Sequence, residues 1–478
     1  MFPLRLKVSL LPAFIWATLL ADPAFSDNGM KRPNIVFVLV DDMGWTDLGC
    51  YGSQYFETPR IDQLAREGMR FTDAYAACAV CSPTRAAIMT GRYPARVGVT
   101  DWIRARFQGG AIPSDKMNPT DYVGGSNRAL LCPPNPLWME HSEVTLAEVL
   151  KDDGYVTCHI GKWHLGADEW YPEHQGFDFN YGGCDYGQPP HYFDPYENQR
   201  QKGIPGLPPR KKGEYLTDRE ADEAVEFIRA HRDRPFFLYL ANYAVHTPIQ
   251  AKPEVTAKYE AKPKTNQKNA KYAAMVESVD DAVGRVLDVL RELALDRTTV
   301  IVFTSDNGGL LGPTHNAPLR SGKGFPYEGG IRVPLIVKWP GLTREGSLNN
   351  MPVSSVDYLP TFVDALTLDL DHPLDGQSLL PTLKNGQSRV RDLFWHFPHY
   401  RGKLGPYSIV RSGDWKLIHR YDGDTQELYH LGDDLSERHE ISSIYPSVAG
   451  RLANRLDRWL GEVGAKLPMI NPSFSQRP

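Results

Sequence analysis

NIVFVLV, the run at residues 34–40, is followed directly by Asp41 and Asp42. Continuous apolar runs rich in β-branched residues are typical of strands that are buried on both faces of a parallel sheet. We therefore predict a central strand over residues 34–40. Two adjacent carboxylates at its end repel each other. Either one of them turns to water or caps the next element, or both face a hard cation, which prefers oxygen ligands.

The same alternation of apolar strand and amphipathic helix continues as far as residue 339. Alternating strands and helices are typical of an α/β domain with a mainly parallel sheet. We therefore predict the α/β class, with a large mixed, mainly parallel sheet sandwiched by helices. The predicted strands are residues 155–160, 235–240, 298–304 and 333–339, and the predicted helices are residues 58–68, 145–151, 218–231 and 271–293.

Polar residues follow several of these strands at their C-terminal ends. Asp41 and Asp42 follow the first strand, and His246 comes shortly after the run at 235–240. Asp306 and Asn307 follow the run at 298–304. In open parallel sheets ligands bind at this edge. A lone histidine after a strand is more often a structural residue, so the prediction of a site rests on the agreement among these positions.

The pattern changes beyond about Asp375. Short runs at 407–411, 415–419 and 426–430 are separated by Gly-Asp turns, and a helix is predicted at 448–460. We predict a smaller C-terminal α+β subdomain with an antiparallel sheet. The predicted organisation is a signal peptide at residues 1–26, a large α/β domain at residues 27–375 and the subdomain at residues 376–478.

The first 26 residues differ from the rest of the chain. Arg5 and Lys7 precede an apolar run at residues 8–20, and Ala24-Phe25-Ser26 offers small residues at alternate positions. This pattern is typical of a secretory signal peptide, because the apolar run is too short to span a bilayer comfortably. We predict cleavage near Ser26, a secreted or periplasmic protein, and no membrane span after signal removal. A retained membrane anchor is the alternative.

Composition argues against one class of partner. The 478 residues are 41% hydrophobic and 23% charged, with a formal net charge of −5. A mildly acidic chain without a basic tract gives no support for nucleic-acid binding, so we predict none. The six cysteines match no zinc motif, and their disulfide pairing stays open.

Two long stretches without clear periodicity, residues 101–140 and 181–213, are rich in turn-forming and aromatic residues. Long loops inside a compact domain are usually functional or disordered. We interpret the first, which contains Trp102, Arg104 and Arg106, as a lid or specificity insert. The second is interpreted as a surface insert near the site. Most individual residues of the first insert can simply be solvated.

Cys81 opens the string CSPTRAAIMTGR at residues 81–92. A bare Cys-x-Pro-x-Arg also describes a buried thiol before a helix start, with Pro83 near the first helical position. Alternatively, a helix starting there directs unpaired N–H groups and its positive dipole end toward an oxyanion, with Arg85 one turn later. The longer string resembles the signature of the formylglycine-dependent, arylsulfatase-like sulfatase family. In that family a maturation enzyme oxidises this cysteine to formylglycine (3-oxoalanine), so the resemblance implies a modified Cys81.

Residues 154–164, GYVTCHIGKWH, resemble the second sulfatase signature. Taken alone, Lys162 and His164 are as readily interpreted as ordinary loop residues. With both signatures in order, the resemblance extends over about residues 33–445, and it makes the α/β domain at residues 27–375 the catalytic one.

The resemblance implies which residues build the active site. It implies one calcium ion per chain, although an oxygen-only ligand set also permits magnesium. The implied metal ligands are Asp41, Asp42, Asp306 and Asn307, joined by the modified Cys81. The implied residues around the sulfate are Arg85, Lys162, His164, His246 and Lys323, with Cys81 as the nucleophile.

The implied activity is hydrolysis of sulfate monoesters by a formylglycine-hydrate nucleophile through a covalent enzyme–sulfate intermediate. His246 is expected to protonate the leaving alcohol, and His164 to accept the proton whose loss expels sulfate. Aromatic-rich, arginine-bearing inserts suit a sulfated saccharide as substrate. An aryl sulfate is the other implied substrate. The implied partner is a formylglycine-generating maturation enzyme, and the oligomeric state stays open.

Two other functions stay open at this point. A phosphomonoester or phosphonate ester hydrolase of the same alkaline phosphatase superfamily shares the fold and the metal carboxylates. A non-catalytic sulfated-glycan-binding protein would have an unmodified Cys81. Turnover of aryl sulfate against aryl phosphate separates the first from a sulfatase, and glycan binding without sulfate release would indicate the second.

Overall fold

β1 (Asn34–Val40) lies between β6 (Phe236–Asn242) and β7 (Thr299–Ser305) and runs parallel to both. All residues of β1 are buried, as the apolar run predicts. The computed structural model describes residues 32–103, 117–387 and 390–474. From residue 33 onward, the described residues form one compact unit. The predicted signal peptide, and Arg104 and Arg106 of the first insert, lie outside the described residues.

Nine strands of the described residues form the large sheet around β1. The others are β2 (Met69–Tyr75), β4 (Val156–Gly161), β5 (Phe179–Tyr181), β8 (Arg332–Lys338), β9 (Ser347–Asn349) and β10 (Val353–Ser354). The order is β10–β2–β8–β7–β1–β6–β4–β5, and β9 pairs with β2. β8 is antiparallel to its neighbours, whereas the other pairings are parallel. The predicted mixed, mainly parallel sheet is confirmed.

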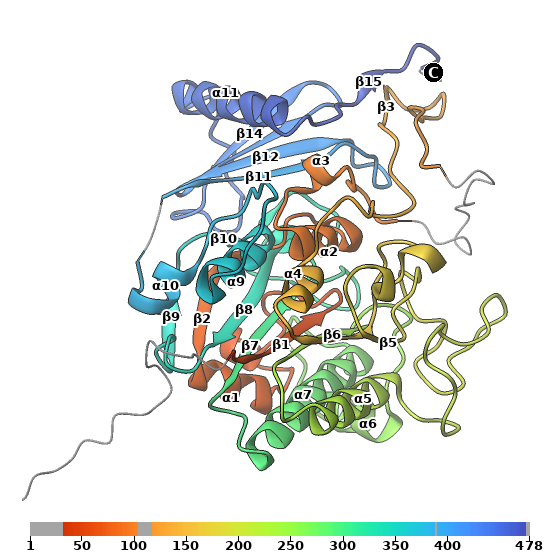
Figure 1. Cartoon of the computed structure of the whole chain (residues 1–478). Coiled ribbons are helices and arrows are strands. Elements are labelled where there is room, and N and C mark those ends of the chain that lie inside the picture. Colours follow the sequence, from red (N-terminus) through yellow and green to blue (C-terminus); the bar gives the residue numbers. More distant parts are fainter. Residues whose placement is uncertain (1–31, 104–116, 388–389, 475–478) are drawn as a thin grey trace, which may run out of the picture. The chain divides into compact units, whose positions relative to one another are not determined.

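Side chains of β1 alternate between two hydrophobic cores, one on each face of the sheet. Val36 and Val38 belong to one core, and Ile35 and Phe37 to the other. Because successive strand residues point to opposite faces, a run without polar residues fills both cores. The first core includes residues of α1 (Pro59–Glu67), α5 (Leu216–Ala230), α6 (Pro253–Glu260) and α7 (Ala270–Glu292). The second includes residues of α2 (Cys81–Thr90), α4 (Leu146–Asp152) and α9 (Tyr358–Leu366). Figure 1 shows the two sets of helices on opposite sides of the sheet.

A smaller antiparallel sheet follows in the C-terminal part. Its strands are, in order, β11 (Asp392–Phe397), β12 (Tyr407–Ser412), β13 (Trp415–Arg420) and β14 (Thr425–His430). One face packs against α11 (Pro446–Glu462), and the other covers Cys78 and Val80. The predicted antiparallel C-terminal part is therefore confirmed, and it supports the segment that leads to Cys81. A domain boundary at residue 375 stays a prediction.

The inserts contribute little regular structure in the part of the chain that is described. Residues 117–140 contain β3 (Leu130–Leu131), which pairs with β15 (Met469–Ile470) near the C-terminus.

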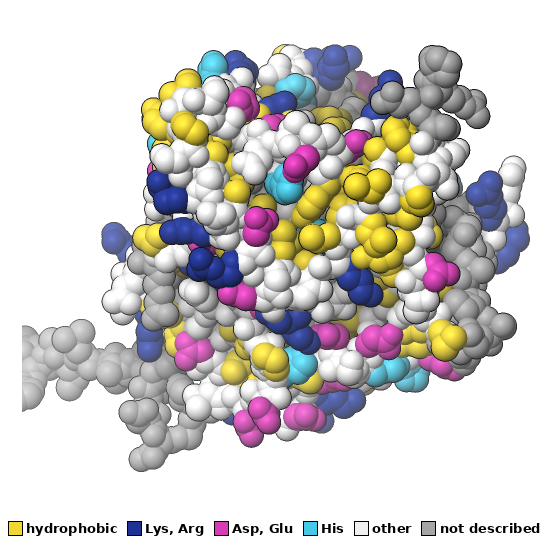
Figure 2. All heavy atoms as spheres, turned by 90° about the horizontal axis from the view of Figure 1, so that it is seen from above, with side chains coloured by type: hydrophobic (Ala, Val, Ile, Leu, Met, Phe, Trp, Pro, Cys, Tyr) yellow, Lys and Arg dark blue, Asp and Glu magenta, His cyan; other side chains and the backbone are white. Residues whose placement is uncertain are grey.

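Figure 2 shows the face that carries α11: hydrophobic side chains gather in the right half of the view, and charged ones of both signs are scattered over the face.

Candidate active site

The C-terminal ends of β1, β6 and β7 meet at one edge of the large sheet. The backbone N–H of Asp41 donates to Ala244 O at 3.0 Å, and that of Val245 donates to Asp41 O at 2.8 Å. The N–H of Asp306 donates to Val40 O at 3.3 Å. These bonds continue the sheet pairing beyond the strands, so residues that are distant in sequence meet here, as predicted for this edge.

Asp42 turns the chain sharply at the end of β1. Its φ of 63° lies in the left-handed region, which aspartate and asparagine tolerate better than most residues. Its N–H donates to Asp306 Oδ1 at 3.2 Å. This turn brings the carboxylate of Asp42 to the same place as that of Asp41 instead of alternating with it.

Three buried oxygens at this edge have no hydrogen-bond partner in the described part of the chain, namely Asp41 Oδ1, Asp42 Oδ2 and Asn307 Oδ1. Ligand atoms of Asp41, Asp42 and His246 also lie within 4.8 Å of one another. Buried polar atoms are normally hydrogen-bonded, and clustered carboxylate and amide oxygens are the ligands that calcium and magnesium prefer. The residues therefore fit a divalent cation.

Two lysines balance part of the negative charge. Lys162 Nζ lies 2.6 Å from Asp41 Oδ2, and Lys323 Nζ lies 2.5 Å from Asp42 Oδ1. Burial and the neighbouring Asp306 raise the pKa of Asp41 well above its ordinary value. Burial acts in the same direction on Asp42, but Lys323 and His246 outweigh it and lower that pKa. A bound cation would relieve the repulsion among these carboxylates.

Cys81 is the first residue of α2 and is 3% exposed. Its Sγ lies 3.4 Å from Nδ1 of His164. The hydroxyl of Ser82 donates to the carbonyl of His164 at 2.9 Å, which ties the loop after β4 to the start of α2. An anion bound beside Cys81 would lie at the N-terminus of α2, where the helix dipole is positive.

The tautomer of His164 follows from its other contact. Nε2 lies 2.6 Å from the carbonyl oxygen of Ile103. Because a carbonyl only accepts, Nε2 carries the proton and Nδ1 is the acceptor that faces Cys81. Burial and Lys162 lower the pKa of His164 well below its ordinary value. His164 is therefore a neutral base aimed at residue 81.

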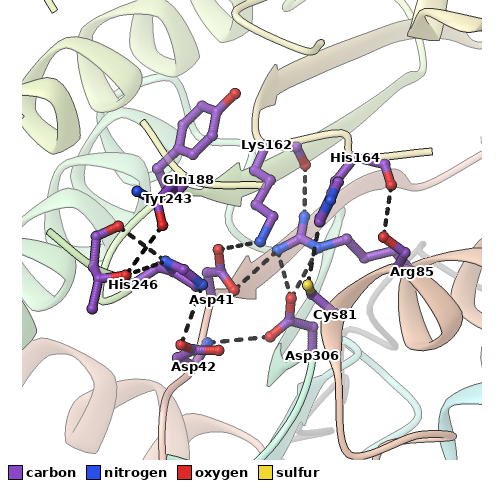
Figure 3. Close-up of polar contacts among 12 residues, drawn as sticks. Asp41, Asp42, Cys81, Arg85, Lys162, His164, Gln188, Tyr243, His246 and Asp306 are labelled. Atoms are coloured by element: carbon purple, nitrogen blue, oxygen red, sulfur yellow. Dashed lines mark hydrogen bonds and ion pairs between the residues drawn. The ribbon is translucent and has the colours of Figure 1, made fainter. Parts of the chain in front are cut away.

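His246 has the opposite tautomer to His164. Its Nδ1 lies 2.9 Å from the carbonyl of Thr247, so this nitrogen carries the proton, and Nε2 lies 3.6 Å from Asp42 Oδ2. Burial and Lys323 lower the pKa of His246 to about 3. Figure 3 shows His246 beside Asp42, across the site from Cys81 and His164.

Arg85 is buried and contacts two other residues of the site, Asp306 and Lys162. Its Nε and Nη2 lie 2.9 and 2.8 Å from Asp306 Oδ2, and its Nη1 donates to Lys162 O at 2.6 Å. Only 2% of its side chain is exposed. Arg85 therefore holds Asp306 and the Lys162 segment in place (Figure 3).

A cavity of about 240 Å³ opens onto the site. Four of the six predicted catalytic residues line it, and the other two, Arg85 and Lys162, do not. The lining residues are Val80, Cys81, Trp102, His164, Gly187, Gln188, His246, Lys323 and Arg401. A larger hollow of about 340 Å³ within residues 195–209 contains none of the candidate residues, so we assign the chemistry to the smaller one.

Sequence reasoning missed two polar lining residues, Gln188 and Arg401. Gln188 lies in an insert whose residues follow no period, and Arg401 lies between two strands of the C-terminal sheet. Neither belongs to a motif, so only the packing identifies them. The six cysteines, all of them in the described part of the chain, are unpaired.

Comparison with known proteins identifies the family. The family model described as Sulfatase matches residues 33–368, and one described as N-sulphoglucosamine sulphohydrolase, C-terminal, matches residues 321–461. A sulfatase of Formosa agariphila is 33% identical, over 92% of this chain and 91% of the relative. The chain belongs to the sulfatase family. It is thus a sulfuric ester hydrolase, as predicted.

Other sulfatases match with similar coverage. Human (Homo sapiens) N-acetylgalactosamine-6-sulfatase is 36% identical, over 86% of this chain and 82% of the relative. The crystal structure of Ps i-CgsB in complex with k-i-k-neocarrahexaose has a TM-score of 0.76 and 29% identity, covering 90% of this sulfatase and 93% of that chain. Among the helices that the structure describes, none combines the length and apolar character of a membrane span.

Proposed function

We propose that this sulfatase hydrolyses sulfate esters of a carbohydrate, with Cys81 oxidised to formylglycine as its nucleophile. One observation carries the proposal: Cys81 sits at a helix N-terminus in the same cavity as His164, His246 and Lys323. The cavity adjoins the carboxylates that fit a cation, because Lys323 pairs with Asp42. A nucleophile, a base and cationic groups therefore surround one space that an anionic ester can enter.

The hydrated formylglycine supplies two hydroxyls on one carbon, one to attack sulfur and one whose proton loss expels sulfate. His164 is placed to accept that proton, because its unprotonated Nδ1 faces residue 81 at 3.4 Å from Sγ. Lys323 neutralises sulfate oxygens from the cavity wall. Arg85 acts as a positioning residue, since its contacts hold Asp306 and the Lys162 carbonyl.

The metal is proposed to be calcium, with magnesium as the alternative. Asp41, Asp42, Asp306 and Asn307 would hold it, since three of them carry oxygens without hydrogen-bond partners in the described structure. Bound there, the cation would stabilise negative charge on the sulfate and make the nucleophilic hydroxyl more acidic. Lys162 keeps the Asp41 carboxylate oriented through its 2.6 Å ion pair.

His246 is proposed to protonate the leaving alcohol. In the substrate-free site its imidazole is neutral, with a pKa of about 3, and the negative charge of an arriving sulfate ester favours the protonated form. We expect His246→Ala to lower kcat/KM for esters of poorly leaving alcohols by ~10²- to 10⁴-fold. Activated aryl sulfates need little protonation and should lose far less. Steady-state rates over a series of leaving groups measure this difference.

His191→Ala is the matched control, since His191 lies outside the lining of the cavity. It should leave the leaving-group dependence as in the wild type. An equal loss on activated and unactivated esters in His246→Ala would contradict the acid assignment and point to Lys323 as proton donor.

A saccharide substrate is supported by the cavity wall and by the relatives. Trp102 and Gln188 line the cavity with Arg401. An aromatic ring can stack on a sugar face, and an amide can hydrogen-bond to hydroxyls. Relatives are described as N-acetylgalactosamine-6-sulfatases, and Ps i-CgsB was solved with a neocarrahexaose. We propose the same broad class for this chain.

The reaction is tested by comparing aryl sulfate with aryl phosphate and phosphonate esters, using fully modified protein with calcium. We expect kcat/KM for the sulfate to exceed that for the phosphate by ~10²-fold or more, an energy difference of about 3 kcal/mol. Preference for the phosphate or phosphonate would replace the proposal with a hydrolase of that kind. Saccharide binding without sulfate release would indicate a binding protein.

Maturation and location belong to the same proposal. Formation of formylglycine requires a formylglycine-generating enzyme as a partner. The N-terminal pattern that predicts a signal peptide cleaved near Ser26 supports secretion or a periplasmic location. The catalytic domain is proposed to extend to residue 375.

A further inference from the structure

Arg401 lines the cavity that contains Cys81, His246 and Lys323. It comes from the loop between β11 and β12, so the C-terminal sheet contributes a side chain to the active site. No motif covers this residue, and the chemistry described above does not use it.

The loop around Arg401 is held by several contacts. Arg401 and Leu404 exchange backbone hydrogen bonds of 2.9 and 3.0 Å across a tight turn. Arg128 donates to the carbonyl of Gly402 at 2.6 Å and lies over the ring of Tyr400 at 4.4 Å. These contacts hold the backbone of the turn, so the position from which the Arg401 side chain extends toward the cavity is fixed.

The side chain of Arg401 crosses the backbone next to Lys323. A Cβ added to Gly324 would lie 2.0 Å from Nε and 2.1 Å from Cδ of Arg401. Gly324 has a φ of +85°, which favours glycine, and any larger residue there would displace the Arg401 side chain from this position. The guanidinium is thereby placed beside the lysine that faces the sulfate site.

Arg401 differs from the other cations of the site in having no counter-ion among the residues that the structure describes. Lys162 and Lys323 each form an ion pair with an aspartate, and Arg85 pairs with Asp306. Within the described residues, the Arg401 guanidinium has no hydrogen-bond or ion-pair partner. A half-buried guanidinium in a cavity wall gains most from an anion, such as a carboxylate or a sulfate, that accepts two hydrogen bonds from its planar fork.

We propose that Arg401 binds a second anionic group of the substrate, either a carboxylate or a further sulfate, carried on or next to the sugar that holds the scissile ester. This inference rests on the proposed saccharide sulfatase function. It makes Arg401 a specificity-determining residue, because a substrate with only one anionic group leaves its guanidinium unpaired.

The test uses Arg401→Met, which keeps the apolar stem over Gly324 and removes the charge. Three oligosaccharides with the same scissile sulfate are compared: one otherwise neutral, one with a neighbouring uronate and one with a second sulfate. We expect the ratio of kcat/KM for a doubly anionic substrate to that for the neutral one to fall by ~10- to 100-fold in Arg401→Met. The doubly anionic substrate whose ratio falls shows whether Arg401 binds a carboxylate or a second sulfate.

Lys403→Ala is the matched control, because Lys403 belongs to the same turn, is exposed and lies outside the cavity lining. It should keep the wild-type ratio, and Arg401→Lys should retain part of it. An equal loss by Arg401→Met on all three substrates would overturn the inference, since Arg401 would then serve the scissile sulfate or the fold. If the wild type releases no sulfate from any of them, the proposed function itself fails.

Discussion

Replacing Cys81 by alanine is expected to lower kcat/KM for an aryl sulfate by ~10⁴-fold or more, because loss of a nucleophile removes the whole covalent route. The folded structure should change little. Cys81 is small and 3% exposed, and alanine is a good helix former at the start of α2. The measurement is steady-state sulfate release, together with thermal unfolding to show that the variant is folded.

Cys78→Ala is the control for this variant. Cys78 is also buried, lies three residues earlier and packs in the core beneath the C-terminal sheet. Its replacement should cost stability but retain most of the activity per folded molecule. Peptide mass spectrometry completes the experiment: wild-type protein made with an active maturation system should show a Cys81 peptide lighter by the mass change from thiol to aldehyde. Full activity with an unmodified Cys81 would rule out the formylglycine mechanism.

Replacing Asp42 by asparagine is the second change with a large expected effect. Asparagine has the same shape and tolerates the φ of 63° at this position, so the substitution removes mainly one charge. We expect calcium affinity to fall and kcat/KM to drop by roughly 10³-fold, since a metal supplies several kcal/mol of transition-state stabilisation. Stability supplies a second readout. Calcium should raise the melting temperature of the wild type, and the same concentration should raise that of Asp42→Asn much less.

Asp47→Asn separates metal binding from structure. Asp47 is buried nearby, but its carboxylate accepts hydrogen bonds from the Gly44 N–H at 2.8 Å, the Tyr272 hydroxyl at 2.6 Å and the Thr314 hydroxyl at 2.7 Å. The NH₂ group of an asparagine at this position would face groups that also donate hydrogen bonds. Stability should therefore fall, while the calcium-induced rise in melting temperature remains. If both variants keep the same calcium response, Asp42 is not a ligand.

The sequence patterns were sufficient for the centre of the fold. β1 is apolar throughout because it serves two cores, and a run of that kind has few other interpretations. The positions of Asp41, Asp42, Asp306 and His246 followed from strand ends alone, since parallel strands bring their C-terminal ends to one edge. The resemblance added Cys81, Lys162 and Lys323, which no periodicity would have selected.

Other features depend on packing that no local pattern records. The strand β11 (Asp392–Phe397) was not predicted. Partly exposed and buried residues alternate over its first four positions, but its last three residues are all buried. Arg401 reaches the cavity only because the C-terminal sheet packs against Cys78 and Val80. The placement of Arg85 is a further example. The resemblance associates it with the sulfate, whereas its contacts are with Asp306 and the Lys162 carbonyl.

The pairing of β1 also sets the order of events during synthesis. Its neighbours are residues 237–242 and 299–305, so the first strand must wait for about 200 further residues before its nearest partner exists. At 5–20 residues per second this wait lasts roughly 10–40 s. Until then α2 has no completed sheet to pack against. The thiol at residue 81, which is 3% exposed in the folded protein, would therefore be accessible during this interval to the maturation enzyme that we propose.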